Sequence, residues 1–299
     1  MRRCMKYYSL IALAGLVLLW GCERRKDTIH IATKPMTEQF ILGEMLSLLI
    51  EQNSDLHVKI TKGVGGGTSN IHPAMLRGDF DLYPEYTGTG WLVILKKDTL
   101  LPPDKLYAEL QKDYSREYGL KWVAPYGFNN AYSLAVSNDA AQKYHLKTFS
   151  DLARYPDRFI FGAEYDFYEI NDGYADLCAY YNLKFKKNLD MDIGLKYEAI
   201  KSGKIDVMNI FTTDGQLNGA NLTVLEDDRH FFPSYYCATI VREETLKDHP
   251  ELEGILKEME GILTDSDMAK LNYEVDIKHR PERDVAAEFL TRKGLLKQE

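Results

Sequence analysis

The sequence predicts an α/β protein of two lobes, each a mostly parallel sheet flanked by helices. Strand-like and helix-like segments alternate in the order β-α-β-α-β over residues 28–84, and the pattern starts again near residue 126. A strand-like segment at 234–242 is then followed only by helix-like stretches. Alternation of this kind is typical of parallel sheets covered by helices. We therefore expect the chain to build one lobe, cross into a second, return, and finish with helices on the first.

The elements expected in the first lobe begin with an alternating strand at 28–33, which Pro35 interrupts. A helix is expected at 37–52 because apolar residues recur on one face there, with Thr37 as its N-cap. The later elements are a strand at 57–60, a glycine-rich turn whose Thr68 or Ser69 caps a helix ending near Gly78, and a strand that Pro84 ends.

The second lobe is expected to contain strands at 159–165 and 204–211 and helices at 172–181 and 193–203. The strand at 234–242 leads back to the first lobe, where helices follow at 249–263 and 265–275. This order predicts a first lobe of residues 28–128 and 233–299 and a second lobe of residues 129–232.

The first 21 residues are expected to be a secretion signal rather than part of the fold. Arg2, Arg3 and Lys6 precede a short apolar run, which is followed by Gly21 and Cys22. The run is shorter than the roughly 20 apolar residues that a spanning helix needs. A cysteine directly after a small residue at this point resembles a bacterial lipobox, so we expect a lipid on Cys22 and a polar tether at 22–27. A plain signal peptide cut nearby is the alternative.

Charge and cysteine content narrow the function. Removing residues 1–21 takes away three basic residues and no acidic one, so the formal charge changes from −8 to −11. An acidic chain is a poor candidate for binding nucleic acid. We expect an extracytoplasmic monomer attached to the cell membrane through Cys22. Cys178 and Cys237 could form a disulfide there or remain two separate thiols, since their spacing carries no signature.

One motif occurs twice, as "LRGDFDLYPEYTGTG" (76–90) and "IKSGKIDVMNIFTTDG" (200–215). In each copy a glycine is followed three positions later by an aspartate, and eight positions later by an aromatic residue with a threonine behind it. Ligands bind at the carboxyl ends of strands in open parallel sheets. We therefore expect Tyr86 and Phe211 to face one cleft from opposite lobes. Asp81 and Asp206 are expected to be turn and helix-end partners.

Signatures of catalysis and of metal binding are absent from the sequence. The seven histidines are scattered, and neither a His-Glu-x-x-His nor a Cys-x-x-Cys motif occurs. A Gly-x-Ser-x-Gly motif is also absent, and the glycine-rich turn lacks the Gly-Lys-Ser/Thr ending of a P-loop. The sequence therefore predicts a protein that is not an enzyme and needs no cofactor or metal.

Aromatic residues lie where the two lobes should meet: Tyr86, Tyr132, Phe211 and Tyr235. Converging rings suit a quaternary ammonium group, which has no N–H to donate and is held by ring faces at about 0.5–2 kcal/mol each. Tyr86 follows Glu85 in what should be a polar loop, which favours a ligand-facing role. Core packing is the alternative for the other rings, and Tyr236 competes with Tyr235 because neighbours on a strand point to opposite sides.

Five segments resemble the substrate-binding proteins of osmoprotectant (glycine betaine, carnitine, choline) ABC importers, the OpuAC/ProX-like family. They are "ATKPMTEQFILGEML", "GGGTSNIHPAMLRGDFDLYPEYTGTGW", "FGAEYDFYEINDGY", "IDVMNIFTTDGQL" and "FFPSYYCATIVR". The resemblance implies the two-lobed fold of type II periplasmic binding proteins, with a two-strand hinge and closure over the ligand. It also implies an ABC permease and its ATPase subunits as partners.

The same resemblance implies a ligand site. The family's aromatic cage falls on Tyr86, Tyr132, Phe211 and Tyr235, with Lys34 and Thr89 at the far end of the ligand. A solvated lysine is the alternative for Lys34. Ile170 stands where the family often has an arginine that grips a carboxylate, and isoleucine offers no such grip.

The resemblance therefore predicts a binding protein for choline, glycine betaine, carnitine or a similar compound. Another trimethylammonium such as ergothioneine is the alternative, followed by an amino acid or a polyamine on the same fold. A two-lobed enzyme and a sensory module are weaker alternatives.

Overall fold

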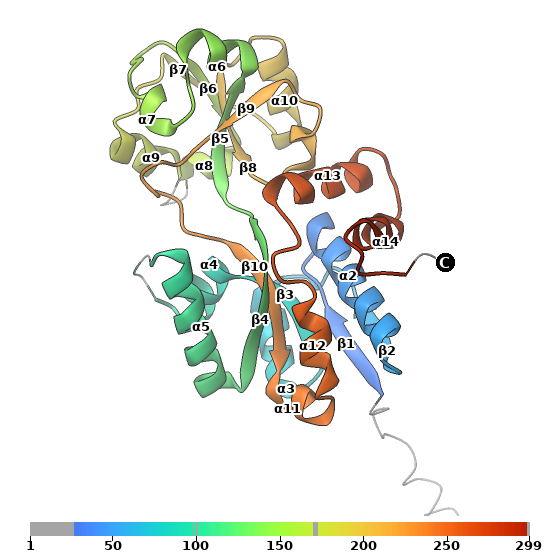
Figure 1. Ribbon diagram of the computed structural model, residues 1–299. Helices are drawn as coiled ribbons and strands as arrows, with labels where there is room; N and C mark the ends of the chain where they lie inside the picture. Colours follow the sequence, from blue (N-terminus) through green and yellow to red (C-terminus); the bar gives the residue numbers. More distant parts are fainter. Residues whose placement is uncertain (1–26, 98, 100, 170–172, 298–299) are drawn as a thin grey trace, which may run out of the picture.

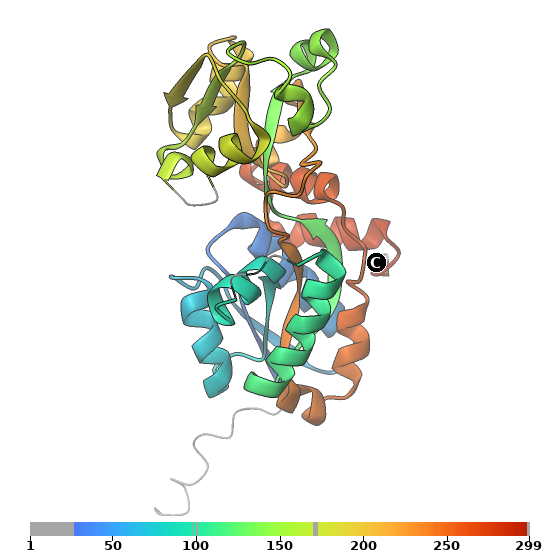
Figure 2. The same cartoon turned by 90° about the vertical axis from the view of Figure 1, so that its left-hand side faces the viewer.

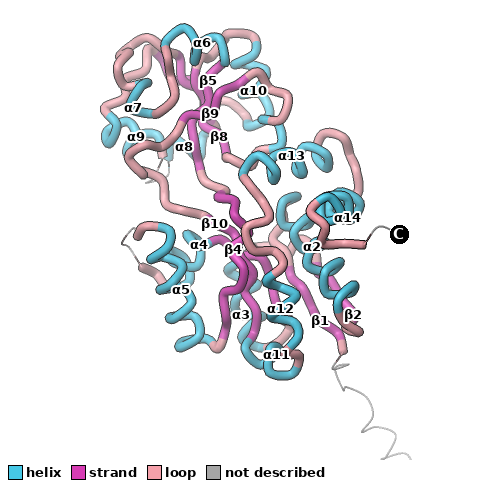
Figure 3. The backbone as a smooth tube through the Cα atoms, viewed as in Figure 1, coloured by secondary structure: helices cyan, strands magenta, loops and turns pink. Residues whose placement is uncertain are grey.

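The computed structural model describes residues 27–97, 99, 101–169 and 173–297, and within them it has two lobes, each built on one sheet (Figure 1). The expected signal peptide at 1–21, Cys22 and Ile170 lie outside the described residues. Seen from the side, the second lobe lies above the first, and extended segments join them (Figure 2). We call residues 129–131 the first linking segment and residues 226–235 the second; they connect β4 to β5 and β9 to β10 (Figure 3).

The sheet of the first lobe has the strand order β2-β1-β3-β10-β4. β1 pairs in parallel with β2 and β3, and β10 runs antiparallel to both β3 and β4. Four of the five strands thus run in one direction, as expected for a mostly parallel sheet. The strands are β1 (Thr28–Ala32), β2 (His57–Thr61), β3 (Leu82–Tyr86), β4 (Leu120–Asn129) and β10 (Tyr236–Arg242).

The sheet of the second lobe has the order β7-β6-β8-β5-β9. β6 pairs in parallel with β7 and β8, and β5 runs antiparallel to both β8 and β9. The strands are β5 (Tyr132–Ser137), β6 (Ile160–Ala163), β7 (Lys187–Asp190), β8 (Val207–Phe211) and β9 (Leu222–Leu225). The two sheets share one plan, in which β3 and β8 are the central strands.

Helices cover both faces of each sheet (Figure 1). On the first lobe they are α2 (Thr37–Asn53), α3 (Thr68–Arg77), α4 (Thr87–Thr89), α5 (Pro103–Tyr118), α11 (Glu243–Asp248), α12 (Glu251–Lys257), α13 (Asp265–Asp276) and α14 (Glu282–Arg292). On the second they are α6 (Asn138–Tyr144), α7 (Phe149–Leu152), α8 (Tyr165–Glu169), α9 (Tyr174–Tyr181) and α10 (Ile193–Lys201). Successive side chains along a strand point to opposite faces of the sheet, so they pack into different hydrophobic clusters. Trp122 packs with α3 and α5, whereas Val123 packs with α2 and α12.

Helix α13 contacts both lobes. It packs against α2 of the first lobe and against the 3₁₀ turn Gly215–Leu217 of the second. The contact with the turn is close, because a Cβ atom on Gly215 would lie 2.8 Å from the backbone nitrogen of Tyr273. Figure 1 shows α13 directly below the second lobe. The C-terminal helices therefore brace the junction as well as covering the first sheet.

The repeated motif has the same structure in both lobes. Each glycine ends a helical turn with positive φ, 80° at Gly78 and 72° at Gly203, a conformation that favours glycine. The aspartate that follows joins the central strand to the parallel strand beside it in the sheet, β1 in the first lobe and β6 in the second. Asp81 accepts from the backbone N–H of His30 (2.8 Å) and donates its own N–H to the His30 carbonyl (2.8 Å).

Asp206 makes the same two bonds, each 2.8 Å, with Ile160. The aspartates therefore bond to the neighbouring strand rather than within their own turn, and they fix where β3 and β8 begin beside β1 and β6.

Three local predictions were wrong. Thr37 and Thr68 are the first residues of their helices rather than N-caps, and neither helix has a side-chain cap. Their hydroxyls instead donate to Asp276 and Glu85, both at 2.6 Å. Pro84 does not end its strand but lies within β3, opposite Thr239 of β10. Proline has no backbone N–H, so a strand can contain it at a position where that N–H would not bond to a neighbouring strand.

Both cysteines of the described chain are free. Cys237 is buried in β10 of the first lobe, and Cys178 is half-buried in α9 of the second. Burial raises the pKa of the Cys178 thiol to about 11. Of the two possibilities, the structure therefore has separate thiols. Within the residues that the structure describes, no helix has the length and apolar character needed to cross a membrane.

Candidate functional site

The aromatic residues of the repeat end the central strand of each sheet. Tyr86 is the last residue of β3 and lies opposite Cys237 of β10. Phe211 is the last residue of β8 and lies opposite Tyr132, the first residue of β5. Each motif therefore carries an aromatic side chain to the edge of its sheet where the chain crosses between the lobes.

Tyr132 and Phe211 form a stacked pair. Their ring centroids are 4.5 Å apart and their planes are 29° from parallel. Phe167 and Phe232 support Tyr132 from other sides, at centroid distances of 5.2 and 5.8 Å. Phe211 remains 39% exposed although it is an aromatic residue at a strand end. A fixed ring with one open side is a suitable surface for an organic cation.

Tyr86 is buried, with 5% of its surface exposed, and belongs to the core of the first lobe. The expectation of a polar loop was wrong, because Glu85 is fully buried within β3. The Tyr86 hydroxyl donates to the carboxylate of Glu38. Burial and the nearby Glu38 charge raise the pKa of Tyr86 well above its usual value, so the hydroxyl stays protonated.

Lys34 is buried over the Tyr86 ring, with its Nζ atom 4.6 Å from the ring centroid. The ammonium forms an ion pair with Glu85, which also accepts from the Thr68 hydroxyl (2.6 Å) and the Tyr86 N–H (2.7 Å). Lys34 is therefore not the solvated lysine that was the alternative. The glycine-rich turn packs on its stem, since a Cβ atom on Gly67 would lie 3.8 Å from Lys34 Cγ.

The second lobe holds a matching buried pair that sequence reasoning missed. Lys196 of α10 donates to Glu164 (2.5 Å) and to the side chain of Asn209 (2.9 Å), and Asn209 in turn donates to Glu164 (2.8 Å). In each lobe, one member of the pair lies just after the end of a strand: Glu164 after β6 and Lys34 after β1. Each lysine is thus compensated by a carboxylate of its own lobe.

Glu38 connects the two lobes and was also missed. Its carboxylate accepts from Tyr86, from Asn130 in the first linking segment (3.0 Å) and from Asn272 of α13 (3.5 Å). Asn272 also donates to the backbone carbonyl of Thr213 in the second lobe (2.8 Å). The Thr-Glu-Gln motif contains Glu38, but its partners lie up to 234 positions away. Only the folded chain shows that they meet.

Burial raises the pKa of the Glu38 carboxyl. A carboxyl whose pKa is higher in the folded state binds more protons there, so stability falls as the pH rises from the unfolded value through the folded value. We expect Glu38→Gln, which keeps an oxygen acceptor without the charge, to be at least as stable as wild type at pH 7.5. The difference should disappear near pH 4. Urea unfolding at pH 4 and pH 7.5 measures the difference in free energy of unfolding between the variant and wild type. If Glu38→Gln is less stable than wild type at pH 7.5 and this deficit is smaller at pH 4, the account is contradicted.

Tyr235 and Tyr236 face opposite sides of the second linking segment and its strand. Tyr235 lies against α4, because a Cβ atom on Gly88 would come within 2.6 Å of its ring. Tyr236 instead lines a cavity of about 960 Å³. Since successive residues of an extended segment point to opposite sides, Tyr235 faces away from this cavity.

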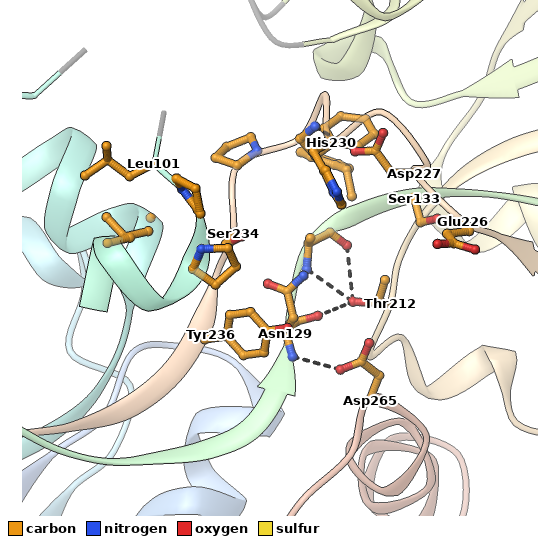
Figure 4. Close-up of a pocket in the computed structure, with 18 of the residues that line it drawn as sticks. Leu101, Asn129, Ser133, Thr212, Glu226, Asp227, His230, Ser234, Tyr236 and Asp265 are labelled. Carbon is orange, nitrogen blue, oxygen red and sulfur yellow. Dashed lines mark hydrogen bonds between the residues drawn. The ribbon is translucent and has the colours of Figure 1, made fainter. Parts of the chain in front are cut away.

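The cavity lies between the lobes (Figure 4). Tyr132 is one of its lining residues. Its polar lining includes Asn129, Ser133, Thr212, Glu226, Asp227, His230, Ser234, Tyr236 and Asp265. The other five predicted site residues, all within the described chain, do not line it. Thr89 ends α4, partly exposed, just before a π-helical turn at Gly90–Ile94, a type of irregularity often found at functional sites.

The structure thus brings four of the six predicted ligand residues together as two pairs, Tyr132 with Phe211 and Lys34 with Tyr86. Tyr235 and Thr89 belong to neither pair. Glu38 joins Tyr86 to Asn130 of the first linking segment, the segment that leads to Tyr132. No group of three or more histidine, cysteine or acidic side chains in the described residues is arranged to hold a metal ion.

The chain matches known proteins over most of its length. Residues 27–292 match the model of the OpuAC family, described as the substrate-binding domain of an ABC-type glycine betaine transport system. The ergothioneine transport permease/ergothioneine binding protein of Helicobacter pylori is 46% identical over 97% of this chain. This chain spans 53% of that relative, about half of its length.

Two further relatives are similar over nearly their whole length. The carnitine transport binding protein of Listeria monocytogenes is 35% identical, over 97% of this chain and 96% of that protein. A crystal structure of a glycine betaine/carnitine/choline ABC transporter superposes with a TM-score of 0.86 and 31% identity. The match covers 89% of this chain and 99% of that one.

Proposed function

Because the chain belongs to the family of substrate-binding domains of ABC-type glycine betaine transport systems, we propose that it captures a quaternary ammonium compound between its lobes for import. The ligand is choline, glycine betaine, carnitine or a similar compound, and an ABC permease with its ATPase subunits receives it. The observation that carries the proposal is the Tyr132–Phe211 stack, which presents a ring face at the junction. This role needs no catalysis and no cofactor.

The cage is proposed to consist of Tyr86, Tyr132, Phe211 and Tyr235, and the stack forms its most accessible wall. Tyr86 contributes from the first lobe, where Lys34 already lies over one face of its ring. Lys34 and Thr89 then line the end of the ligand remote from its ammonium group. We propose the lobe boundaries 28–128 with 233–299, and 129–232, because the two sheets separate at the linking segments.

The charge of the site bears on which ligand is preferred. Lys34 and Lys196 are each paired with a glutamate, so neither is a free partner for a ligand carboxylate. Ile170 adds no cation at the position where an arginine often occurs in the family. Both observations favour recognition through the ammonium end rather than through the carboxylate.

Ergothioneine is a specific second candidate, because the Helicobacter pylori relative named for it is 46% identical to this chain. Calorimetric titration of the chain from Glu23 onward with choline, glycine betaine, carnitine and ergothioneine, at one salt concentration, tests both proposals. Binding of at least one compound supports the ligand class, and the tightest binder names the ligand. Absence of binding to all four would contradict the proposed class.

Attachment to the membrane through a lipid on Cys22 is also proposed, which places the binding lobes outside the cytoplasm. The support is the short apolar run that ends at Gly21 and Cys22. Metabolic labelling with a fatty acid tests it: wild type should carry the label, and Cys22→Ser should not. A labelled Cys22→Ser variant would contradict this proposal.

A further inference from the structure

The threonine that follows each aromatic residue of the repeat is bonded to a linking segment. Thr87 follows Tyr86 in the first lobe, and Thr212 follows Phe211 in the second. The Thr87 hydroxyl donates to the backbone carbonyl of Ser234, 147 positions away, at 3.0 Å. The Thr212 hydroxyl donates to the backbone carbonyl of Asn129, 83 positions away. Each copy of the repeat therefore provides a contact with a linking segment as well as an aromatic ring. We call the two linking segments together the hinge.

The Thr87 contact is buried and tightly packed. Thr87 is buried at the start of α4, and the next residue is Gly88. A Cβ atom on Gly88 would lie 2.9 Å from the carbonyl oxygen that Thr87 binds and 2.6 Å from the Tyr235 ring. The second linking segment therefore rests directly on the turn that carries Tyr86.

The Thr212 contact involves three backbone groups of the first linking segment. Besides donating to Asn129, the Thr212 hydroxyl accepts from the Ala131 N–H (3.1 Å), and the Thr212 N–H donates to the Ala131 carbonyl (3.0 Å). On the other side, the Asn129 N–H donates to Asp265 at the start of α13 (2.8 Å). Figure 4 shows Thr212, Asn129 and Asp265 meeting at one wall of the cavity.

The two linking segments are also joined to each other. The side chain of Asn129 accepts from the Tyr235 N–H at 2.6 Å, and the Asn130 N–H donates to the Tyr235 carbonyl at 3.2 Å. Thr87 of the first lobe therefore holds one segment, Thr212 of the second lobe holds the other, and the segments hold each other. When one lobe rotates relative to the other, the linking segments therefore either move with these bonds intact or lose them.

We propose that Thr87 and Thr212 are positioning residues that tie each cage aromatic to a linking segment, so that the ring and the linking segment move as one unit. Each threonine is bonded by the chain itself to its aromatic neighbour and by its hydroxyl to a linking segment. A ligand that draws the rings together then rotates the hinge instead of only displacing a side chain. This inference rests on the proposed function, since it assumes that the lobes close on a ligand.

Valine substitutions test this role because valine keeps the shape of threonine and removes the hydroxyl. Thr87→Val and Thr212→Val are compared with Thr291→Val, whose hydroxyl also donates to a backbone carbonyl (Ala287, 2.8 Å) but within α14. All are made in the chain from Glu23 onward, which keeps every described residue. Spin labels at Lys105→Cys in α5 and Gln142→Cys in α6, in a Cys178→Ser background, report the distance between the lobes.

Without ligand, each hinge variant should give a distance distribution at least about twice as wide as that of wild type, and Thr291→Val should match wild type. With whichever of choline, glycine betaine, carnitine or ergothioneine binds, the dissociation rate constant should rise about 3- to 10-fold, the value of one hydrogen bond. Thr87→Ser and Thr212→Ser keep the hydroxyl and should restore the wild-type width.

Unchanged widths in both valine variants, or equal broadening in Thr291→Val or in the serine variants, would overturn the proposal. If a valine variant fails to fold, the serine variants still decide, because a broadened serine variant contradicts a role for the hydroxyl. The distances between the lobes are measured without ligand. They therefore test the role of the threonines independently of the proposed function, which the ligand titration tests.

Discussion

Replacing Phe211 by leucine is expected to weaken binding of the trimethylammonium ligand about tenfold. Leucine keeps an apolar side chain at the end of β8 but removes the ring face that a cation would contact. One cation–π contact contributes roughly 0.5–2 kcal/mol, and 1.4 kcal/mol is a factor of ten in affinity. Calorimetric titration of the variant with the tightest ligand of wild type measures the effect.

Phe211→Tyr is the matched control, because it keeps the ring and its stacking with Tyr132. Its affinity should stay within about threefold of wild type. Since Phe211 is 39% exposed, neither change should alter the melting temperature appreciably. Equal affinity of the leucine and tyrosine variants would show that Phe211 acts only as an apolar surface, and the cage would then lack its proposed wall.

The second large effect is on stability. Glu85→Gln is expected to lower the free energy of unfolding by about 3–5 kcal/mol, the usual cost of removing one partner of a buried ion pair. The substitution leaves the Lys34 ammonium buried without its carboxylate. Urea unfolding followed by circular dichroism measures the loss.

Two comparisons make this result specific to burial. The double variant Lys34→Met with Glu85→Leu should recover most of the stability, because an apolar pair of similar volume removes both charges. Asp79→Asn breaks an exposed pair with Arg77 and should change stability by less than about 1 kcal/mol. A loss below about 1 kcal/mol in Glu85→Gln would contradict the description of Lys34 and Glu85 as a buried ion pair.

The topology was largely predictable from local patterns in the sequence. The repeated glycine and aspartate mark where β3 and β8 begin, and the structure gives both aspartates the same two backbone bonds. The return strand at 234–242 was also predicted and is β10, Tyr236–Arg242. The glycine and aspartate of each motif lie close together in the chain, and the return strand is one continuous segment, so local patterns mark them. The partners of the aspartates lie 51 and 46 positions away and were not predicted.

Residues that depend on distant partners were not predictable. Tyr86 was expected in a polar loop because Glu85 precedes it, but Glu85 is buried by Lys34 and Thr68, which lie 51 and 17 positions earlier. The threonines of the repeat carried no assignment, because their acceptors are backbone carbonyls of the linking segments. A carbonyl group is present in every residue, so no residue type in the sequence marks it as a partner.

The position of the ligand tests the central claim most directly. A crystal structure of the chain from Glu23 onward, grown with the tightest ligand from the titration, locates the quaternary nitrogen. The proposal predicts that this nitrogen lies within about 6 Å of the ring centroids of Tyr132 and Phe211. A ligand bound in the cavity lined by Tyr236 and Asp265, with its nitrogen away from the Phe211 ring, would contradict the aromatic cage.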